Sequence, residues 1–170
     1  MNETKKLRVA LFFGGVSSEH EVSCVSASTW LRALAQAPCA DRYEVFPVGI
    51  TKQGRWLACS PTPEAMADGS WEKGADCTPC VLSPDRTDHG IWLLKDGKAE
   101  LVHIDICAPV MHGKNGEDGT IQGLFELARI PYVGCGVLGS AVCMDKAVAN
   151  TIMDAAGVPH CKWASAIRAE

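Results

Sequence analysis

HGKNGEDGTIQG, at residues 112–123, is the most informative stretch of this chain of 170 residues. It holds four glycines in twelve positions, between an apolar run at 104–111 and a helix-like pattern. Glycine loses more backbone entropy on folding than any other residue. This density therefore suggests positive φ angles or a close approach of the main chain to a bound molecule. We interpret the stretch as a ligand-binding loop between a strand and a helix.

A second glycine loop, GGVSSEHE at 14–21, follows an apolar run at 7–13. A run of this kind is typical of a strand buried on both faces of a parallel sheet. Ser18 and Glu21 have the spacing of a helix capping box, so a helix should begin here and pack on the sheet. Its expected packing face consists of Val22, Val25, Thr29, Trp30 and Ala33.

The next strand is predicted at 43–50 and completes a β-α-β unit. Pro47 within it suggests an edge position or a bulge. From 51 to 103 the pattern changes, and Asp96-Gly97 is a typical two-residue hairpin turn. We expect this region to form an antiparallel excursion from the main sheet.

Two more strands, at 104–111 and 130–133, flank the glycine loop and its helix. That helix has one apolar face, formed by Ile121, Leu124, Phe125 and Ala128. Asp145 can cap a further helix that stops at Gly157 and has Val148, Ile152 and Ala155 on one face. The predicted fold class is α/β: an open, doubly wound, mostly parallel sheet with strand order 2-1-3-4 and an antiparallel hairpin insertion.

Composition limits the possible partners. The chain is 47% apolar and 21% charged, with a formal net charge of −4 and scattered Lys and Arg residues, so a nucleic-acid partner is not expected. No apolar run approaches the roughly 20 residues of a membrane span, and the first is too short for a leader. We therefore expect a cytoplasmic protein with no membrane partner. Its nine cysteines should be free thiols, with Cys77-Thr-Pro-Cys80 a chance spacing.

Three charged or titratable residues follow predicted strands. In open parallel sheets, ligands bind beyond the carboxyl ends of the strands. The predicted strand order would place Glu19 and His112 on one crevice, with Lys146 at the same edge. Glu19 could receive a substrate ammonium, and His112 could orient a carboxylate or move a proton. Lys146, at a helix start, could contact a phosphate together with free N–H groups.

Each of these residues also has a simpler interpretation. Glu19 could only complement a helix dipole, and Lys146 could be a solvated surface lysine. Glu117 and Asp118 fit capping and turn roles better than acid catalysis. The other histidines, His20, His89, His103 and His160, are interpreted as structural or solvated. GCGVLG at 134–139 matches a dinucleotide-binding pattern, but it lacks the acidic partner of that motif.

Residues 112–123 resemble, position for position, the H-G-x-x-G-E-D-G signature of D-alanine-D-alanine ligases. The elements GGxSxExEVS at 14–23, YVGCG at 132–136 and CMDK at 143–146 resemble the same family in order and spacing. The long excursion makes the chain look more like the long-form ligases. That group includes vancomycin-resistance enzymes that make D-alanyl-D-serine or D-alanyl-D-lactate.

The resemblance implies a Rossmann-like pre-ATP-grasp domain of an ATP-grasp ligase that makes D-alanyl-D-alanine for peptidoglycan. ATP would phosphorylate one D-alanine, and the amine of a second would attack the acyl phosphate. Glu19 would hold the ammonium of the first D-alanine, and His112 and Gly113 would bind beside the carboxylate of the same D-alanine. Lys146 would contact ATP. The family also implies Mg²⁺ and a homodimer.

Such ligases are roughly twice this length. The resemblance therefore implies a substrate domain at 1–144 and the start of a truncated ATP-grasp domain at 145–170, with most of the ATP and Mg²⁺ site missing. We expect the fragment alone to be inactive. The alternatives are a D-alanine-D-serine or D-alanine-D-lactate ligase, and a non-catalytic α/β module that binds a small molecule. A dinucleotide-binding oxidoreductase is a weaker alternative, because TKQG at 51–54 offers no acidic ribose contact.

Overall fold

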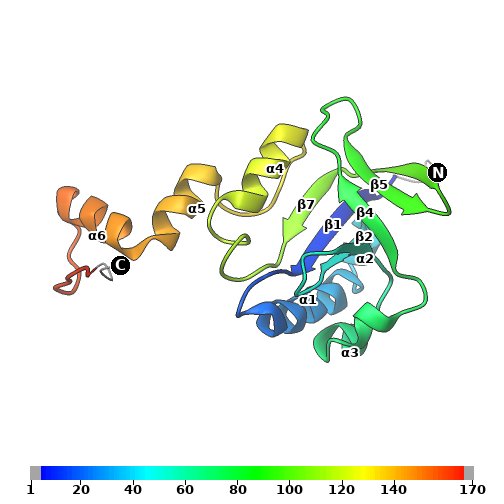
Figure 1. The fold of residues 1–170 in the computed structure, drawn as a ribbon, viewed down its shortest axis with the longest axis horizontal. Helices are drawn as coiled ribbons and strands as arrows, with labels where there is room; N and C mark the ends of the chain where they lie inside the picture. Colours follow the sequence, from blue (N-terminus) through cyan, green and yellow to red (C-terminus); the bar gives the residue numbers. More distant parts are fainter. Residues whose placement is uncertain (1–4, 167–170) are drawn as a thin grey trace.

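The computed structural model describes residues 5–166. Its strands are β1 (Leu7–Gly14), β2 (Tyr43–Ile50), β3 (Trp56–Ala58), β4 (Thr78–Leu82), β5 (Gly90–Lys95), β6 (Lys98–His103) and β7 (Ile106–Pro109). Its helices are α1 (His20–Leu34), α2 (Cys39–Arg42), α3 (Pro63–Ala67), the 3-10 helix η1 (Ser70–Lys73), α4 (Thr120–Ala128), α5 (Val137–Met144) and α6 (Lys146–Ala155). The strands form one sheet in the order β6-β5-β4-β3-β2-β1-β7 (Figure 1).

The parallel half of the sheet has the predicted order. β1 lies between β2 and β7 and is parallel to both. Beyond β7, the expected fourth strand is reduced to one parallel bridge between Cys107 and Tyr132. The 2-1-3-4 arrangement is thus confirmed.

The antiparallel half is the expected excursion. β3, β4, β5 and β6 each pair antiparallel with the preceding strand. Asp96 and Gly97 have φ angles of 52° and 71°, and they form the predicted turn between β5 and β6. The prediction of an edge position or a bulge at Pro47 is wrong, because β2 is an interior strand, between β3 and β1. Pro47 lies just past the β2–β3 pairing, where its carbonyl accepts a hydrogen bond from the Cys59 N–H.

Helices cover both faces of the sheet, which makes three layers (Figure 1). Alternate residues of β1 belong to two separate cores. Val9, Leu11 and Phe13 pack with α1, α3 and η1, whereas Ala10 and Phe12 pack with α4. The apolar run of β1 is therefore buried on both faces, as predicted.

The predicted packing face of α1 is wrong. Val22 and Val25 are each 52% exposed. Small side chains are buried in their place: Ser23, Cys24, Ala27 and Ser28. Successive helical residues are turned by about 100°, so an offset of one position rotates the packing face by that angle and leaves Val22 and Val25 outside it. The capping box is also absent: Glu19 is the N-cap residue without a side-chain cap, and Glu21 instead pairs with Lys52.

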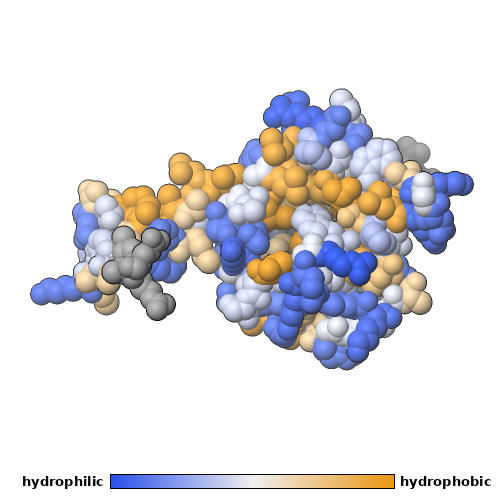
Figure 2. Space-filling model, viewed as in Figure 1, coloured by the Kyte–Doolittle hydropathy of each residue, from blue (hydrophilic) through white to orange (hydrophobic). Residues whose placement is uncertain are grey.

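The helices α5 and α6 extend away from the sheet (Figure 1). Asp145 caps α6 as predicted, and Gly157 follows its end with a φ of 68°. The apolar face of α6 is exposed, with Val148 at 43% and Ile152 at 48%. Figure 2 shows hydrophobic residues, in orange, over part of this projection, with hydrophilic residues at its far end. Within residues 5–166, no helix combines the length and apolar character needed to cross a membrane.

Candidate functional site

The loops after β1 and β7 meet at one edge of the sheet. These two strands are parallel neighbours, so their carboxyl ends lie side by side. Glu19 follows β1 at the start of α1, and His112 and Gly113 follow β7. Parallel pairing therefore brings together residues that are more than 90 positions apart in the sequence.

Gly113 lies directly against the carboxylate of Glu19. The φ angle of Gly113 is +70°, which strains any residue with a β-carbon. A β-carbon built on Gly113 would lie 2.5 Å from Oε2 of Glu19 and 2.8 Å from Oγ of Ser17. Both reasons for a glycine, positive φ and close approach, apply here.

Ser23 of α1 connects the two loops through hydrogen bonds on their buried side. Its hydroxyl accepts a hydrogen bond from the Gly14 N–H at 2.8 Å and donates one to the Val110 carbonyl at 2.5 Å. Ser23 is fully buried. One side chain of α1 thus satisfies the backbone at the ends of two strands and fixes their separation.

His112 is held between α1 and its own loop. Its Nε2 is 3.0 Å from Oγ of Ser26, and its Nδ1 is 3.7 Å from Oε1 of Glu117. If the serine hydroxyl donates to Nε2, the proton of a neutral imidazole is on Nδ1, facing the carboxylate. The ring is 32% exposed, so one edge remains open to a ligand.

Glu117 does not cap the following helix, contrary to the sequence-based expectation. Its Oε2 accepts a hydrogen bond from the Gly113 N–H at 2.8 Å, so it closes the loop back on itself. Asp118 does have the predicted turn role, since it accepts from the N–H groups of Asn115 and Thr120. Partial burial raises the pKa of Asp118, but these hydrogen bonds outweigh it, and the net pKa lies below the usual value.

Glu19 and His112 open into two adjacent cavities rather than one crevice. The cavity beside Glu19, of about 540 Å³, is also lined by Ser17, Lys52, Gly113 and Met144. The second, of about 380 Å³, is lined by His112, Glu117 and residues of α5. The predicted residues meet at one edge, and the turn at His112 and Gly113 separates the cavities.

Lys52 is a charged residue at the site that the sequence did not identify. It follows the carboxyl end of β2, the third parallel strand at this edge. Its ammonium pairs with Glu21, which lowers the pKa of the Glu21 carboxyl and raises the pKa of the Lys52 ammonium. Its position directly after a predicted parallel strand was the signal that could have identified it.

Lys146 is the first residue of α6, as predicted, but it lines neither of these cavities. Its ammonium donates to the Cys143 carbonyl at 2.9 Å. The carboxylate of Asp145 accepts the N–H groups of Ala147 and Val148. The free N–H groups expected for a phosphate are therefore already occupied by a carboxylate.

His20 has the structural role expected of it. It is buried, and its Nδ1 lies 2.9 Å from the Gly15 carbonyl, so it supports the first glycine loop from inside. His160 lies 2.9 Å from Asp154 in the segment after α6. Among residues 5–166, no group of three or more His, Cys, Asp and Glu side chains is placed to hold a metal ion. All nine cysteines are free thiols.

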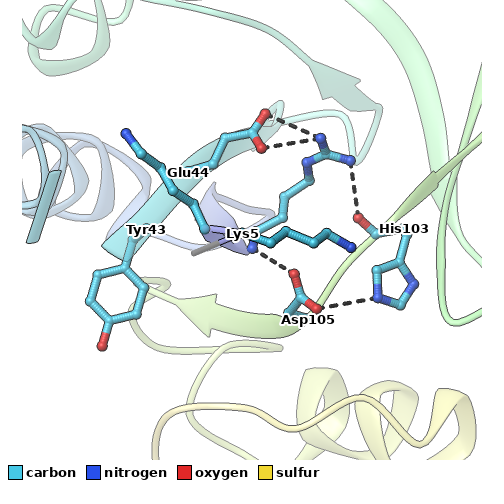
Figure 3. A pocket seen from close by; sticks show the side chains of 7 residues that line it. Lys5, Tyr43, Glu44, His103 and Asp105 are labelled. Carbon is cyan, nitrogen blue, oxygen red and sulfur yellow. Dashed lines mark hydrogen bonds and ion pairs between the residues drawn. The ribbon is translucent and has the colours of Figure 1, made fainter. Parts of the chain in front are cut away.

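A polar pocket at the opposite end of the strands is an ion-pair network (Figure 3). The guanidinium of Arg8 contacts both carboxylate oxygens of Glu44, at 3.1 and 3.2 Å. Asp105 accepts the Arg8 N–H at 2.7 Å and lies 3.3 Å from the His103 ring, and the Arg8 N–H is the main cause of a lowered Asp105 pKa. Its carboxylates are paired within the network, so we assign it a structural role.

Comparison with known proteins agrees with this arrangement of loops. Residues 8–135 match the family described as the D-ala D-ala ligase N-terminus. The chain belongs to this family. Glu19, His112 and Gly113 all lie within the matched part.

Several relatives of this ligase family share about half of the residues. A D-alanine–D-alanine ligase of Caldicellulosiruptor bescii is 49% identical over 91% of this chain and 41% of its own length. The vancomycin B-type resistance protein VanB of Enterococcus faecalis is 45% identical over 90% of this chain and 42% of its own length. The chain therefore spans about two fifths of the length of these relatives.

Solved structures of ligases have the same fold. The VanG D-Ala:D-Ser ligase of Enterococcus faecalis matches with a TM-score of 0.81 and 38% identity, over 90% of this chain and 43% of that one. The D-alanine-D-alanine ligase of Coxiella burnetii matches with a TM-score of 0.78 and 32% identity, over 92% and 43%.

Proposed function

We propose that this chain supplies the first-substrate site of an ATP-dependent ligase that makes D-alanyl-D-alanine for peptidoglycan. The contact between the Glu19 carboxylate and Gly113 is the observation that carries the proposal. It places the Glu19 carboxylate against the residue that follows His112, at the ligand-binding edge of the sheet, where Glu19 and His112 line two cavities on either side of the turn. An amino acid needs both kinds of partner, one for its ammonium and one for its carboxylate.

Each residue has a defined role in this proposal. Glu19 receives the ammonium of the first D-alanine; at 4 Å and an effective dielectric constant near 20 the attraction is about 4 kcal/mol before desolvation. His112 and Gly113 bind beside the substrate carboxylate. That carboxylate attacks the terminal phosphate of ATP and releases ADP. The amine of the second D-alanine then displaces phosphate from the acyl phosphate and forms the peptide bond.

ATP and Mg²⁺ would be bound mainly by the three fifths of the relatives' length that this chain does not span. Lys146 is exposed, which suits a contact with ATP, although the Asp145 carboxylate beside it disfavours a phosphate at the helix terminus itself. We propose residues 1–144 as the substrate domain and 145–170 as the start of the next. A cytoplasmic homodimer completes the proposal.

A D-serine or D-lactate ligase is the alternative within the same chemistry. The relative VanG is a D-Ala:D-Ser ligase, and a 46% identical protein of Streptomyces coelicolor is a putative D-alanine–D-lactate ligase. The first substrate is D-alanine in each case. The choice therefore concerns the second substrate only.

A chimera tests the proposal. Residues 1–170 would replace the matching part of the Caldicellulosiruptor bescii ligase, and phosphate release would be measured with ATP, Mg²⁺ and D-alanine, D-serine or D-lactate. We expect turnover by the chimera and none by residues 1–170 alone. Glu19→Gln should raise KM for the first D-alanine far more than KM for ATP, and Lys146→Ala should do the reverse. Equal effects on both substrates from each change would refute these roles.

A further inference from the structure

Two cysteines face each other across the strands β3 and β4. These strands are antiparallel, and Ala58 of β3 pairs with Thr78 of β4. The same register places Cys59, the residue after β3, directly opposite Cys77, the residue before β4. Both side chains pack in the core on the α1 side of the sheet, Cys59 as a buried member and Cys77 as a partly buried one. We call these two residues the cross-strand pair.

The backbone at the cross-strand pair brings the two side chains close together. In an antiparallel ladder, pairs that exchange backbone hydrogen bonds alternate with pairs that do not, and the Cα atoms of the second kind are only about 4.5 Å apart. The Cys59 N–H donates to the Pro47 carbonyl and the Cys77 N–H to the Gly74 carbonyl, so neither N–H bonds to the other cysteine. The pair is therefore of the second kind. Its separation falls within the roughly 4.4 to 6.8 Å that a disulfide spans.

Contacts on both sides of the cross-strand pair support this placement. At the next position of the register, the Asp76 carboxylate accepts the Ser60 N–H at 2.6 Å, so the two segments remain neighbours there. The two thiols also interact. Burial and then the charge of Asp76 raise the pKa of Cys77, and a hydrogen bond with the Cys59 thiol is the largest effect in the opposite direction.

The C-x-x-C spacing of Cys77 and Cys80 does not make a second pair. Side chains of a strand alternate between its two faces, so residues three positions apart point to opposite sides of the sheet. Cys80 belongs to the core on the α4 side, whereas Cys77 packs against the core on the α1 side. The sheet thus lies between Cys77 and Cys80, and the neighbouring thiol of Cys77 is that of Cys59.

The cross-strand pair is open to solvent through one member only. Cys77 is partly exposed, whereas Cys59 is 6% exposed. Burial is also the main cause that raises the pKa of the Cys59 thiol, which protects it from reagents in solution. A reaction between the two cysteines needs no such access, because the second sulfur is already beside the first.

We propose that Cys59 and Cys77 form a reversible disulfide when the protein meets a small disulfide, R–S–S–R. The Cys77 thiolate attacks one sulfur, a mixed disulfide forms, and RS⁻ leaves and takes up the proton that Cys77 lost. The Cys59 thiolate then attacks the Cys77 sulfur, and the second RS⁻ leaves and takes up the proton of Cys59. Both cysteine sulfurs are oxidised, and R–S–S–R is reduced to two thiols. This assignment does not depend on ligase activity.

The disulfide would close the segment from 59 to 77, which contains α3 and η1. These two helices pack beside α1. Glu64 of α3 pairs with Arg32 of α1, and Glu72 of η1 lies 3.8 Å from His20, the residue that supports the first glycine loop. A closed loop has less conformational entropy in the unfolded chain, so the oxidised protein should resist unfolding more strongly than the reduced one.

Equilibration in glutathione buffers tests the proposal on the full chain. The ratio of reduced to oxidised glutathione would be varied, free thiols would be trapped, and peptide mass mapping would identify each disulfide. The exposed residues Cys135, Cys143 and Cys161 report how an unpaired thiol behaves, as a mixed disulfide with glutathione. We expect the disulfide between Cys59 and Cys77 to withstand about tenfold more reduced glutathione than these mixed disulfides. In urea this advantage should shrink, because strand pairing creates the proximity.

Two variants separate the members of the cross-strand pair. Cys59→Ala removes the second attacking thiol, so Cys77 should accumulate as a mixed disulfide with glutathione, which it should not do in the unmodified protein. Cys80→Ala is the matched control from the same segment, and it should leave the disulfide between Cys59 and Cys77 unchanged. If either variant fails to fold, the disulfide map of the unmodified protein still decides the matter.

Three results in the unmodified protein would overturn the proposal. The first is a disulfide between Cys77 and Cys80, and the second is a lasting mixed disulfide at Cys77. The third is loss of the bond between Cys59 and Cys77 at the same glutathione ratio as the mixed disulfides of the exposed cysteines.

Discussion

The carboxylate of Glu19 occupies the space where Gly113 would carry a β-carbon. The distance from that built β-carbon to Oε2 is 2.5 Å, so the two loops are fitted to each other at this point. Gly113 thereby fixes where the carboxylate can lie.

Gly113→Ala tests this relationship. The positive φ alone should cost about 1 to 2 kcal/mol, and displacement of Glu19 should add to that. Gly97→Ala is the matched control, because Gly97 has a φ of +71° with nothing within 4 Å of its built β-carbon. Urea unfolding of both variants gives the difference between their free energies of unfolding. Equal losses of stability would show that Glu19 moves away freely.

Ser23→Ala should be strongly destabilising for its size. It leaves the Gly14 N–H and the Val110 carbonyl without their hydrogen-bond partner in a buried place, at about 1 to 3 kcal/mol for each unsatisfied group. Ser28→Ala is the control, since the Ser28 hydroxyl bonds only within its own helix: it donates to the Val25 carbonyl and accepts from the Arg32 guanidinium. Denaturant unfolding should separate the two variants by more than 1 kcal/mol, and similar values would contradict the bridging role.

Ser26→Ala should alter the state of His112. With the serine hydroxyl donating to Nε2, the neutral form of the imidazole should carry its proton on Nδ1. The variant should show a mixture of tautomers in the ¹⁵N shifts of the ring. Ser18→Ala, at an exposed position of the first loop, should leave those shifts unchanged. An Nε2–H tautomer in the unmodified protein would refute this hydrogen-bond direction.

Asp118 should make the glycine loop sensitive to acid. Its pKa is lowered in the folded protein, so it stabilises the fold above the unfolded pKa of about 3.9, and this stabilisation is lost as the pH falls through the folded pKa. Asp118→Asn should therefore be less stable than the unmodified protein by about 1 kcal/mol at pH 7, allowing for partial exposure. The difference should vanish near pH 2. The free energy of unfolding of both proteins would be measured in urea from pH 7 to about pH 2. A difference that stays constant over this range would show that the Asp118 carboxylate is not its cause.

Much of the fold could be predicted because β1 and β7 carry strong local signals. Each is a short apolar run that ends in a glycine loop, and parallel strands align their carboxyl ends. That rule was enough to bring Glu19 and His112 to one edge. The Asp96-Gly97 turn was equally predictable, because few other residues accept positive φ at both positions.

The face of α1 could not be predicted in the same way. Its bulky residues suggested the packed side, but α1 buries Ser23 and Ala27 against the sheet. The buried face of α1 consists of small side chains and a hydrogen-bonded serine hydroxyl, whereas hydrophobicity alone would place Val22 and Val25 on that face. The contacts of Ser26 and Glu117 with His112 depend on this packing and on the closed loop, so the local sequence contained no signal for them.

Glu19 lies at the start of α1, Ser23 one turn later and Ser26 beyond it. The position of this one helix therefore determines three polar contacts. A substitution on the buried side of α1, at Ala27 for example, would tilt the helix and shift all three residues together, although Ala27 itself contacts no ligand. For the proposed ligase function, we therefore expect substitutions in the hydrophobic interior to alter substrate preference, and a search for such variants should include the buried side of α1 as well as the residues that line the cavities.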